Sequence, residues 1–182
     1  MNKCAFLLFI VFNFSQVTAQ DVFQKYQKNP DASYLSVSPK MFEMLGKLSI
    51  STGDPKMDGF IEMVKSMKHF RVLSTKNLSI AQEMETWLKD QLAQTDLESV
   101  MNISEQEVEV QFCVVYGSDD SRVDRLVMYV SGAQKIADQE GLELSNLDFI
   151  LLSIEGNIDL EQVAVLTEII DIPGGNFLKK IN

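Results

Sequence analysis

The stretch that decides the fold runs from Glu107 to Val130 and reads EVEVQFCVVYGSDDSRVDRLVMYV. From Glu107 to Tyr116, polar and apolar residues alternate with the period of a β-strand. A polar turn at residues 117–121 follows, and residues 123–130 return as a second apolar run. The stretch therefore predicts an antiparallel β-hairpin.

The two faces of this hairpin differ in polarity. One face of its first strand is apolar throughout, with Val108, Val110, Phe112, Val114 and Tyr116. We expect this face to lie against the core, in a strand whose other face is half exposed. The opposite face is of mixed character and carries Cys113, Val115, Val127 and Tyr129. If helices cover only one face of the sheet, these four residues form an exposed patch for a partner or for self-association. If a helix or the N-terminal segment crosses that face, they belong to the core, and we favour this second interpretation.

Periodicity on either side of the hairpin predicts further helices and strands. Helices are expected at residues 22–28, 39–48, 55–67, 79–92 and 159–172, and strands at 33–37, 70–73 and 147–154. Ser38 and Asp54 each precede a proline, while Ser79 and Asp159 each stand three residues before a glutamine, as helix starts do. The near-continuous apolar character of the last strand indicates a central position, covered on both faces. This order predicts an α+β fold of two layers, with a mostly antiparallel sheet and helices packed on one face.

The N-terminal residues carry the pattern of a secretory signal. Lys3 and the α-amino group supply positive charge, an apolar run follows, and residues 17–19 read Val-Thr-Ala, a cleavage pattern. We predict a signal peptide at residues 1–19, cleavage before Gln20, and a single domain at residues 20–182. The apolar run is far shorter than the roughly 20 residues that span a bilayer.

Charge and cysteine content narrow the expected partners and location. Without residues 1–19 the chain keeps 15 basic and 26 acidic residues, because Lys3 is the only charged residue removed, and its net charge is −11. Such a charge repels nucleic acids and anionic lipid headgroups, so neither is an expected partner. Cys4 lies before the apolar run, where a lipid-modified cysteine would not stand. We therefore expect an exported protein, periplasmic or secreted, without a lipid anchor.

Few residues are candidates for catalysis or metal binding. His69 is the only histidine, and Cys113 is the only cysteine after cleavage, so they offer one Cys–His pair and too few ligands for a zinc site. We expect His69 at the surface or a strand edge, and Cys113 as a buried apolar residue; a free thiol or an intermolecular disulfide are the alternatives for Cys113. Asp119, Asp120 and Asp124 crowd the hairpin turn without the ligand spacing of an EF-hand, and we interpret them as solvated turn residues. No catalytic residue, metal site or cofactor is predicted.

Four landmarks carry a resemblance to a known family: residues 34–42 (YLSVSPKMF), 70–74 (FRVLS), 152–160 (LSIEGNIDL) and 172–174 (IPG). Together they resemble a family of uncharacterised exported proteins of Bacteroidota, domain of unknown function 4252. The resemblance implies an envelope location in a Gram-negative cell and an envelope-stress or regulatory setting. It implies no activity and transfers no functional residue.

These observations support a functional hypothesis and one alternative. We expect a non-enzymatic envelope protein that binds another protein or a surface component, through a sheet face, as a binding or regulatory module. The alternative is an envelope enzyme in which paired carboxylates act as acid and base.

Overall fold

The computed structural model describes residues 21–47, 53–105, 107–119, 121–135 and 148–160. The predicted signal peptide and most of the helix predicted at residues 159–172 lie outside these ranges. The helices are α1 (Val22–Tyr26), α2 (Pro39–Lys47), α3 (Pro55–Ser66) and α4 (Leu78–Gln94). The strands are β1 (Ala32–Val37), β2 (Met67–Thr75), β3 (Glu98–Glu105), β4 (Val108–Tyr116), β5 (Arg122–Ser131) and β6 (Phe149–Asp159).

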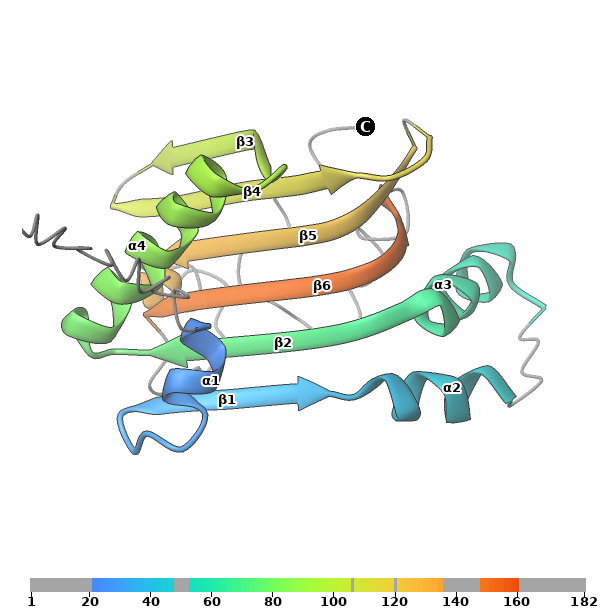
Figure 1. The fold of residues 1–182 in the computed structure, drawn as a ribbon, viewed down its shortest axis with the longest axis horizontal. Helices are drawn as coiled ribbons and strands as arrows, with labels where there is room; N and C mark the ends of the chain where they lie inside the picture. The colour runs from blue at the N-terminus through green and yellow to red at the C-terminus, as the bar shows by residue number, and fades with distance from the viewer. Residues whose placement is uncertain (1–20, 48–52, 106, 120, 136–147, 161–182) are drawn as a thin grey trace, which may run out of the picture.

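A six-stranded sheet in the order β1-β2-β6-β5-β4-β3 forms the centre of the molecule (Figure 1). Strands β3 to β6 follow one another as a meander, and β6 closes the sheet by pairing with β2. Helix α4 carries the chain from β2 to β3, which lies at the opposite edge. All the described pairings are antiparallel, so the predicted α+β fold with a mostly antiparallel sheet is confirmed.

The predicted hairpin is formed by β4 and β5, with Val110 opposite Val130 and Cys113 opposite Val127. One detail of the predicted pattern is wrong. Tyr116, expected on the core face, is 48% exposed. The register shift between Val115 and Tyr116 comes from an extra residue on β5, Asp124, so Tyr116 still pairs with the buried Val123. Tyr116 is the last residue of β4, beside the hairpin turn, where its side chain is open to solvent.

Strand β6 lies between β2 and β5, as its apolar composition predicted. Its residues 150–154 are all buried, including the polar Ser153. The sequence pattern missed β3, which has charged or polar residues at most positions and is largely exposed. An edge strand needs to bury few side chains, so it carries little apolar periodicity.

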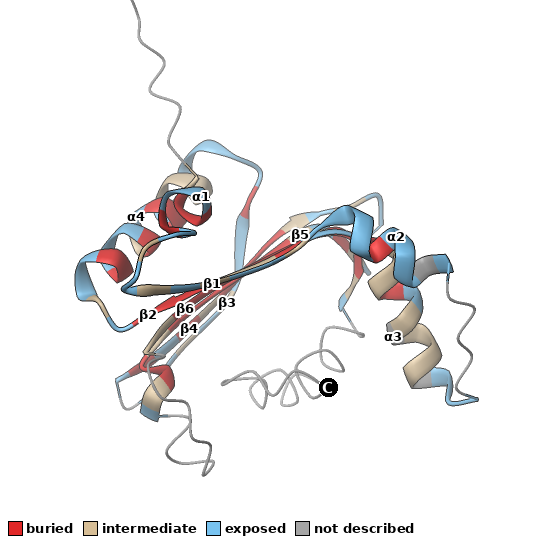
Figure 2. Ribbon diagram, turned by 90° about the horizontal axis from the view of Figure 1, so that it is seen from below, coloured by how far each residue is buried: buried red, intermediate tan, exposed pale blue. Residues whose placement is uncertain are grey.

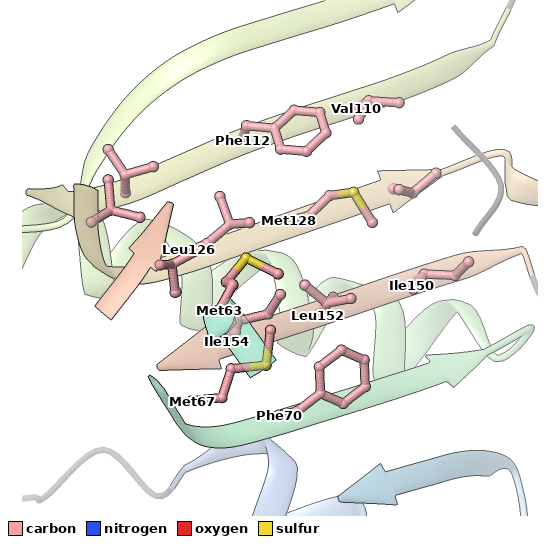
Figure 3. Packing of buried hydrophobic residues seen from close by; sticks show 14 of the residues in the cluster. Met63, Met67, Phe70, Val110, Phe112, Leu126, Met128, Ile150, Leu152 and Ile154 are labelled. Carbon is pink, nitrogen blue, oxygen red and sulfur yellow. The ribbon is translucent and has the colours of Figure 1, made fainter. Parts of the chain in front are cut away.

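A large apolar cluster covers one face of the sheet (Figure 3). It includes Phe70 of β2, Phe112 of β4, Met128 of β5 and Leu152 of β6. At one end of the sheet, α2 and α3 contribute Phe42 and Met63 to this cluster (Figure 2). Each large apolar side chain buried in this way contributes about 1.5–3 kcal/mol of transfer free energy.

Helices α1 and α4 cover the other face of the sheet (Figure 2). A second apolar cluster joins Phe23 of α1 and Trp87 of α4 to Leu73, Val127 and Leu151 of the sheet. The helical layer expected on one face is therefore formed by α1 and α4. The predicted half exposure of β4 is confirmed: on the face turned toward α4, Cys113 is buried, Gln111 and Val115 are half-buried, and Glu109 is exposed. The α4 connection covers the part of this face that carries Cys113 and Val127.

Two local expectations about the helices change in detail. Helix α4 begins at Leu78, and its N-cap is Asn77 instead of the predicted Ser79. The side-chain oxygen of Asn77 accepts hydrogen bonds from the backbone N–H groups of Ser79 (2.9 Å) and Ile80 (3.4 Å). In α2 the helical apolar spacing buries only Phe42. Met41 and Leu45 of the same helix are 49% and 36% exposed.

Candidate functional site

The four residues considered as a possible interaction face belong to the second apolar cluster. Cys113, Val127 and Tyr129 are buried, and Val115 is partly buried against them. The core interpretation of these residues is therefore confirmed, and their interpretation as an exposed patch is wrong. The reason is the crossing of α4 from β2 to β3, a long-range connection that covers this face.

Burial also determines the acidity of two groups on this face. Loss of solvent around the hydroxyl raises the pKa of Tyr129 to about 12. Burial raises the pKa of the Cys113 thiol as well, and a hydrogen bond involving Ser99 opposes this shift only in part. A thiol with a raised pKa carries little thiolate, which is the reactive form. Cys113 thus has the properties of a buried apolar residue, as expected.

The structure does not assemble the single possible Cys–His pair. His69 is exposed on β2, whereas Cys113 is buried on β4. Strands β6 and β5 stand between them, and three strand spacings amount to about 14 Å. A nucleophile and its base must approach within hydrogen-bond distance, so this pair is not a catalytic unit in the structure.

The acidic hairpin turn is held by its own hydrogen bonds. The Asp119 carboxylate accepts from the backbone N–H of Ser121 at 3.1 Å and from its hydroxyl at 2.7 Å. Asp124 is exposed, and Asp120 lies outside the described residues. Within the described ranges, no group of three histidine, cysteine or acidic side chains is arranged to hold a metal ion.

Strand β1 is one edge of the sheet, and no other strand in the described part of the chain pairs with its second side, which is the first candidate surface. None of its residues is charged and none is proline, and its pairing with β2 runs without a register shift from Ala32 to Val37. The side chain of Leu35 is 54% exposed. Unpaired backbone groups on a regular, uncharged edge can accept a further strand.

Helix α2 continues the chain directly from β1 and extends the exposed apolar surface (Figure 1). Met41, Met44 and Leu45 recur at helical spacing, and Met44 is 56% exposed. With Leu35 they form what we call the β1–α2 surface. Exposed apolar residues that recur over consecutive elements are typical of protein-binding surfaces, and methionine adapts to partners of different shape.

The opposite edge, β3, is built differently. Glu98 and Glu105 stand at its two ends, and its register against β4 shifts between Ser99 and Met101. Charged ends and an irregular register are two ways in which natural sheets block edge pairing. The two edges therefore differ in how readily they could accept a strand.

A polar hollow of about 420 Å³ lies beside the start of β1, between Asp31 and Asn77. The hydroxyl of Thr75 donates to the carbonyl of Asp31 at 2.6 Å and accepts from the backbone N–H of Asn77 at 2.9 Å. These bonds join the start of β1 to the end of β2. The polar groups around the hollow thus serve to hold the turn between the end of β2 and α4 against the start of β1.

The helix-covered face also contains polar side chains, which we call the arginine cluster: Arg71, Arg125, Ser153, Glu155 and Asp21. Arg71 donates to Glu155 at 2.9 Å and to the carboxylate of Asp21, which also caps α1. The two carboxylates thus share one arginine as partner. This arrangement pairs both carboxylates with the guanidinium group of Arg71.

Arg125 lies on the same face and is neutralised less directly. It stands opposite Glu155 in the sheet, but its hydrogen-bond partner is the neutral side-chain oxygen of Gln91 on α4, at 3.1 Å. Burial lowers the pKa of Arg125; the nearby carboxylate of Glu155 raises it, and the positive charge of Arg71 lowers it further. Its guanidinium lies over the ring of Trp87, 5.5 Å from the ring centre.

Three polar groups of the arginine cluster have no hydrogen-bond partner among the residues that the structure describes: the Nε groups of Arg71 and Arg125 and the hydroxyl of Ser153. Ser153 stands opposite Arg71 in the sheet, and Glu155 opposite Arg125, so these residues share one face. Sequence reasoning missed this cluster. The sequence feature that could have revealed it is the position of each arginine two residues before a buried apolar residue: Arg71 before Leu73, and Arg125 before Val127. Residues two apart in a strand lie on the same face, so both arginines lie on a buried face of the sheet.

Comparison with known proteins gives one match. A family model described as "Domain of unknown function (DUF4252)" matches residues 26–166. No curated protein and no solved structure matches the chain. Among the helices in the described residues, none combines the length and apolar character needed to cross a membrane.

Proposed function

We propose, on the premise that this chain belongs to the family described as domain of unknown function DUF4252, that it is an exported, non-enzymatic protein that binds another protein. The family description assigns no activity, so the proposal rests on the residues of this chain. Its location would be the periplasm or the cell exterior, without a lipid anchor. Its binding surface would be the β1 edge and the adjoining exposed side of α2.

The start of the folded domain supports the export part of the proposal. Asp21 caps α1 by accepting a hydrogen bond from the backbone N–H of Phe23 at 3.2 Å, and Val22 and Phe23 are buried. Cleavage before Gln20 would therefore leave α1 and its cap intact. A cut only a few residues later would remove side chains from the second apolar cluster.

The observation that carries the binding part is the difference between the two sheet edges. Strand β3 has acidic ends and an irregular register, whereas β1 is regular and uncharged and exposes Leu35. A partner that adds an extended segment to β1 would satisfy its free backbone groups and cover Leu35. The segment that fits is a short strand with an apolar residue facing Leu35 and few acidic residues, because the chain is itself acidic.

Site-specific crosslinking in the cell that produces the protein tests this surface. A photo-crosslinking residue is placed at Ser33 of β1 or, as a matched control, at Ser104 of β3; both serines are exposed on edge strands. We expect a discrete adduct only from position 33, and peptide mapping should place the partner's attachment point in an extended segment.

Blocking variants provide the second arm of this experiment. Leu35→Lys places a charge on the β1 edge and should abolish the adduct at position 33. Val100→Lys makes the same kind of change on β3, where the side chain is 48% exposed, and should leave the adduct intact. Equal adducts from both edges, or an adduct that survives Leu35→Lys, would contradict the proposal. An adduct that contains only two copies of this chain would contradict binding of another protein and would show that the β1 edge mediates self-association.

Export is tested separately by mass spectrometry of the protein recovered from outside the cytoplasm. We expect a chain that begins at Gln20 and lacks the mass of one ammonia molecule, because an N-terminal glutamine cyclises. A protein that retains residues 1–19 and fractionates with the cytoplasm would contradict the export proposal without affecting the crosslinking result.

A further inference from the structure

We propose that the arginine cluster beneath α1 and α4 is a binding site for a small oxyanion, a carboxylate or phosphate group. The site is separate from the β1–α2 surface and does not depend on the proposed function. Its floor is formed by β2, β6 and β5, which bring Arg71, Ser153 and Arg125 to one face of the sheet.

The first argument is that the described acceptors of the cluster do not satisfy all of its donors. Each unpartnered group can donate: two arginine Nε–H groups and the hydroxyl of Ser153, which can also accept and is 0% exposed. Buried donors without partners are rare in folded proteins, and each one calls for a bound group. An oxyanion carries several lone pairs and no competing N–H group, so one such group can accept from all of these donors.

The second argument is the distribution of charge. Arg71 binds both carboxylates of the cluster, those of Asp21 and Glu155. Arg125 has only the amide oxygen of Gln91 as its hydrogen-bond partner. Arg125 is half-buried with its Nε shielded from solvent, and a guanidinium in that position without a carboxylate in contact favours binding of an additional anion.

The third argument is the orientation of the two guanidinium groups. Arg71 lies over the ring of Phe23 at 4.5 Å from its centre, and Arg125 lies over the ring of Trp87 at 5.5 Å. Aromatic rings occupy the faces of a guanidinium, whereas its N–H groups point outward in its plane. The aromatic contacts thus hold both side chains by the faces of their guanidinium groups and do not use the Nε–H groups.

Trp87 makes the proposal directly measurable, because it is the only tryptophan of the chain and contacts Arg125. The full exported chain is titrated with sodium phosphate or sodium acetate, with chloride as the control anion at the same ionic strength. Tryptophan fluorescence and the thermal midpoint Tm are recorded. We expect a saturable fluorescence change and a rise in Tm with phosphate or acetate; the anion that saturates at lower concentration identifies the class of oxyanion.

Two variants separate a specific site from a general salt effect. Arg125→Gln should weaken the anion response about tenfold or more, since a charged hydrogen bond contributes at least about that factor. Arg122→Gln removes the same charge from the same strand, at a site whose side chain is 43% exposed, and should leave the response unchanged. Should Arg125→Gln fail to fold, Ser153→Ala removes a single donor and should also weaken the response.

Four outcomes would overturn the proposal. A response that does not saturate would mean that water alone fills the site. A saturable response that is equal in the parent and in Ser153→Ala would mean that the anion binds elsewhere. A response that Arg122→Gln reduces as much as Arg125→Gln would indicate general electrostatics. Saturation by chloride at the same concentration as phosphate and acetate would indicate a halide site instead of an oxyanion site.

Discussion

Substitution of Phe23 by alanine tests whether α1 is an integral part of the domain core. The Phe23 side chain is 0% exposed, although it belongs to a helix of only five residues. Its ring meets Trp87 edge-on, with ring centres 5.5 Å apart and planes at 86°, and Arg71 lies over it. The loss of this side chain should therefore leave a cavity between α1, α4 and the sheet.

The expected cost follows from the size of the buried ring. Replacement of a fully buried phenylalanine by alanine costs about 3–5 kcal/mol. In a domain of this size, each kcal/mol lowers Tm by about 2–4 °C, so Tm should fall by roughly 6–20 °C. Because whole domains are stable by only about 5–15 kcal/mol, this loss is a large fraction of the total.

Equilibrium unfolding in urea, followed by circular dichroism and by Trp87 fluorescence, measures this free energy. Leu78→Ala is the matched control, because that leucine is 66% exposed on α4 and its loss should cost less than about 0.5 kcal/mol. A loss below about 1 kcal/mol for Phe23→Ala would refute the reasoning. In that case α1 would not be a structural part of the core, and the cleavage position would no longer be supported by the fold.

Three further predictions concern single residues. Gly156 has φ +144°, and a Cβ at this position would lie 2.5 Å from the carbonyl oxygen of Ser66. Gly156→Ala should therefore lower the free energy of unfolding by at least about 1–3 kcal/mol. Urea titration measures this loss, and an unchanged midpoint would contradict the prediction. The pKa of Tyr129 is raised from 10.0 to about 12, so between these pH values the folded protein keeps the phenolic proton while the unfolded chain loses it. The contribution of Tyr129 to the free energy of unfolding is therefore complete below pH 10 and is lost between pH 10 and 12. Tyr129→Phe should therefore flatten the fall in stability over that range, measured by urea midpoints; an equally steep fall would count against it. Cys113 is buried with a raised pKa, so a thiol reagent should label it far more slowly in the native protein than in denaturant, and equal rates would show that the cluster is open.

The sequence pattern was sufficient to predict the elements that bury a continuous apolar face. Alternation along residues 107–130 predicted the β4–β5 hairpin, and the apolar run in β6 predicted a central strand. The helix predicted at residues 79–92 is α4, and Met84 and Trp87, three residues apart on it, are both buried. These predictions succeeded because side-chain direction follows from the local backbone period alone.

Features that depend on contacts between distant strands could not be read from local periodicity. The period shows that Cys113 and Val127 share a face, but only the path of α4 across the sheet determines that this face is covered. The edge positions of β1 and β3 follow from the pairing of β6 with β2.

The sequence by itself determines the acidic character of the chain, because net charge depends only on composition. The signal peptide and the single domain are predictions from the sequence, the first from an N-terminal apolar run after a basic residue. The arginine cluster was decided by tertiary structure. Arg71 and Arg125 lie 54 positions apart in the chain, and Ser153 and Glu155 lie on a third strand. Only the order β2-β6-β5 brings them together, because the register of antiparallel strands places distant residues opposite one another, and no local pattern encodes that register.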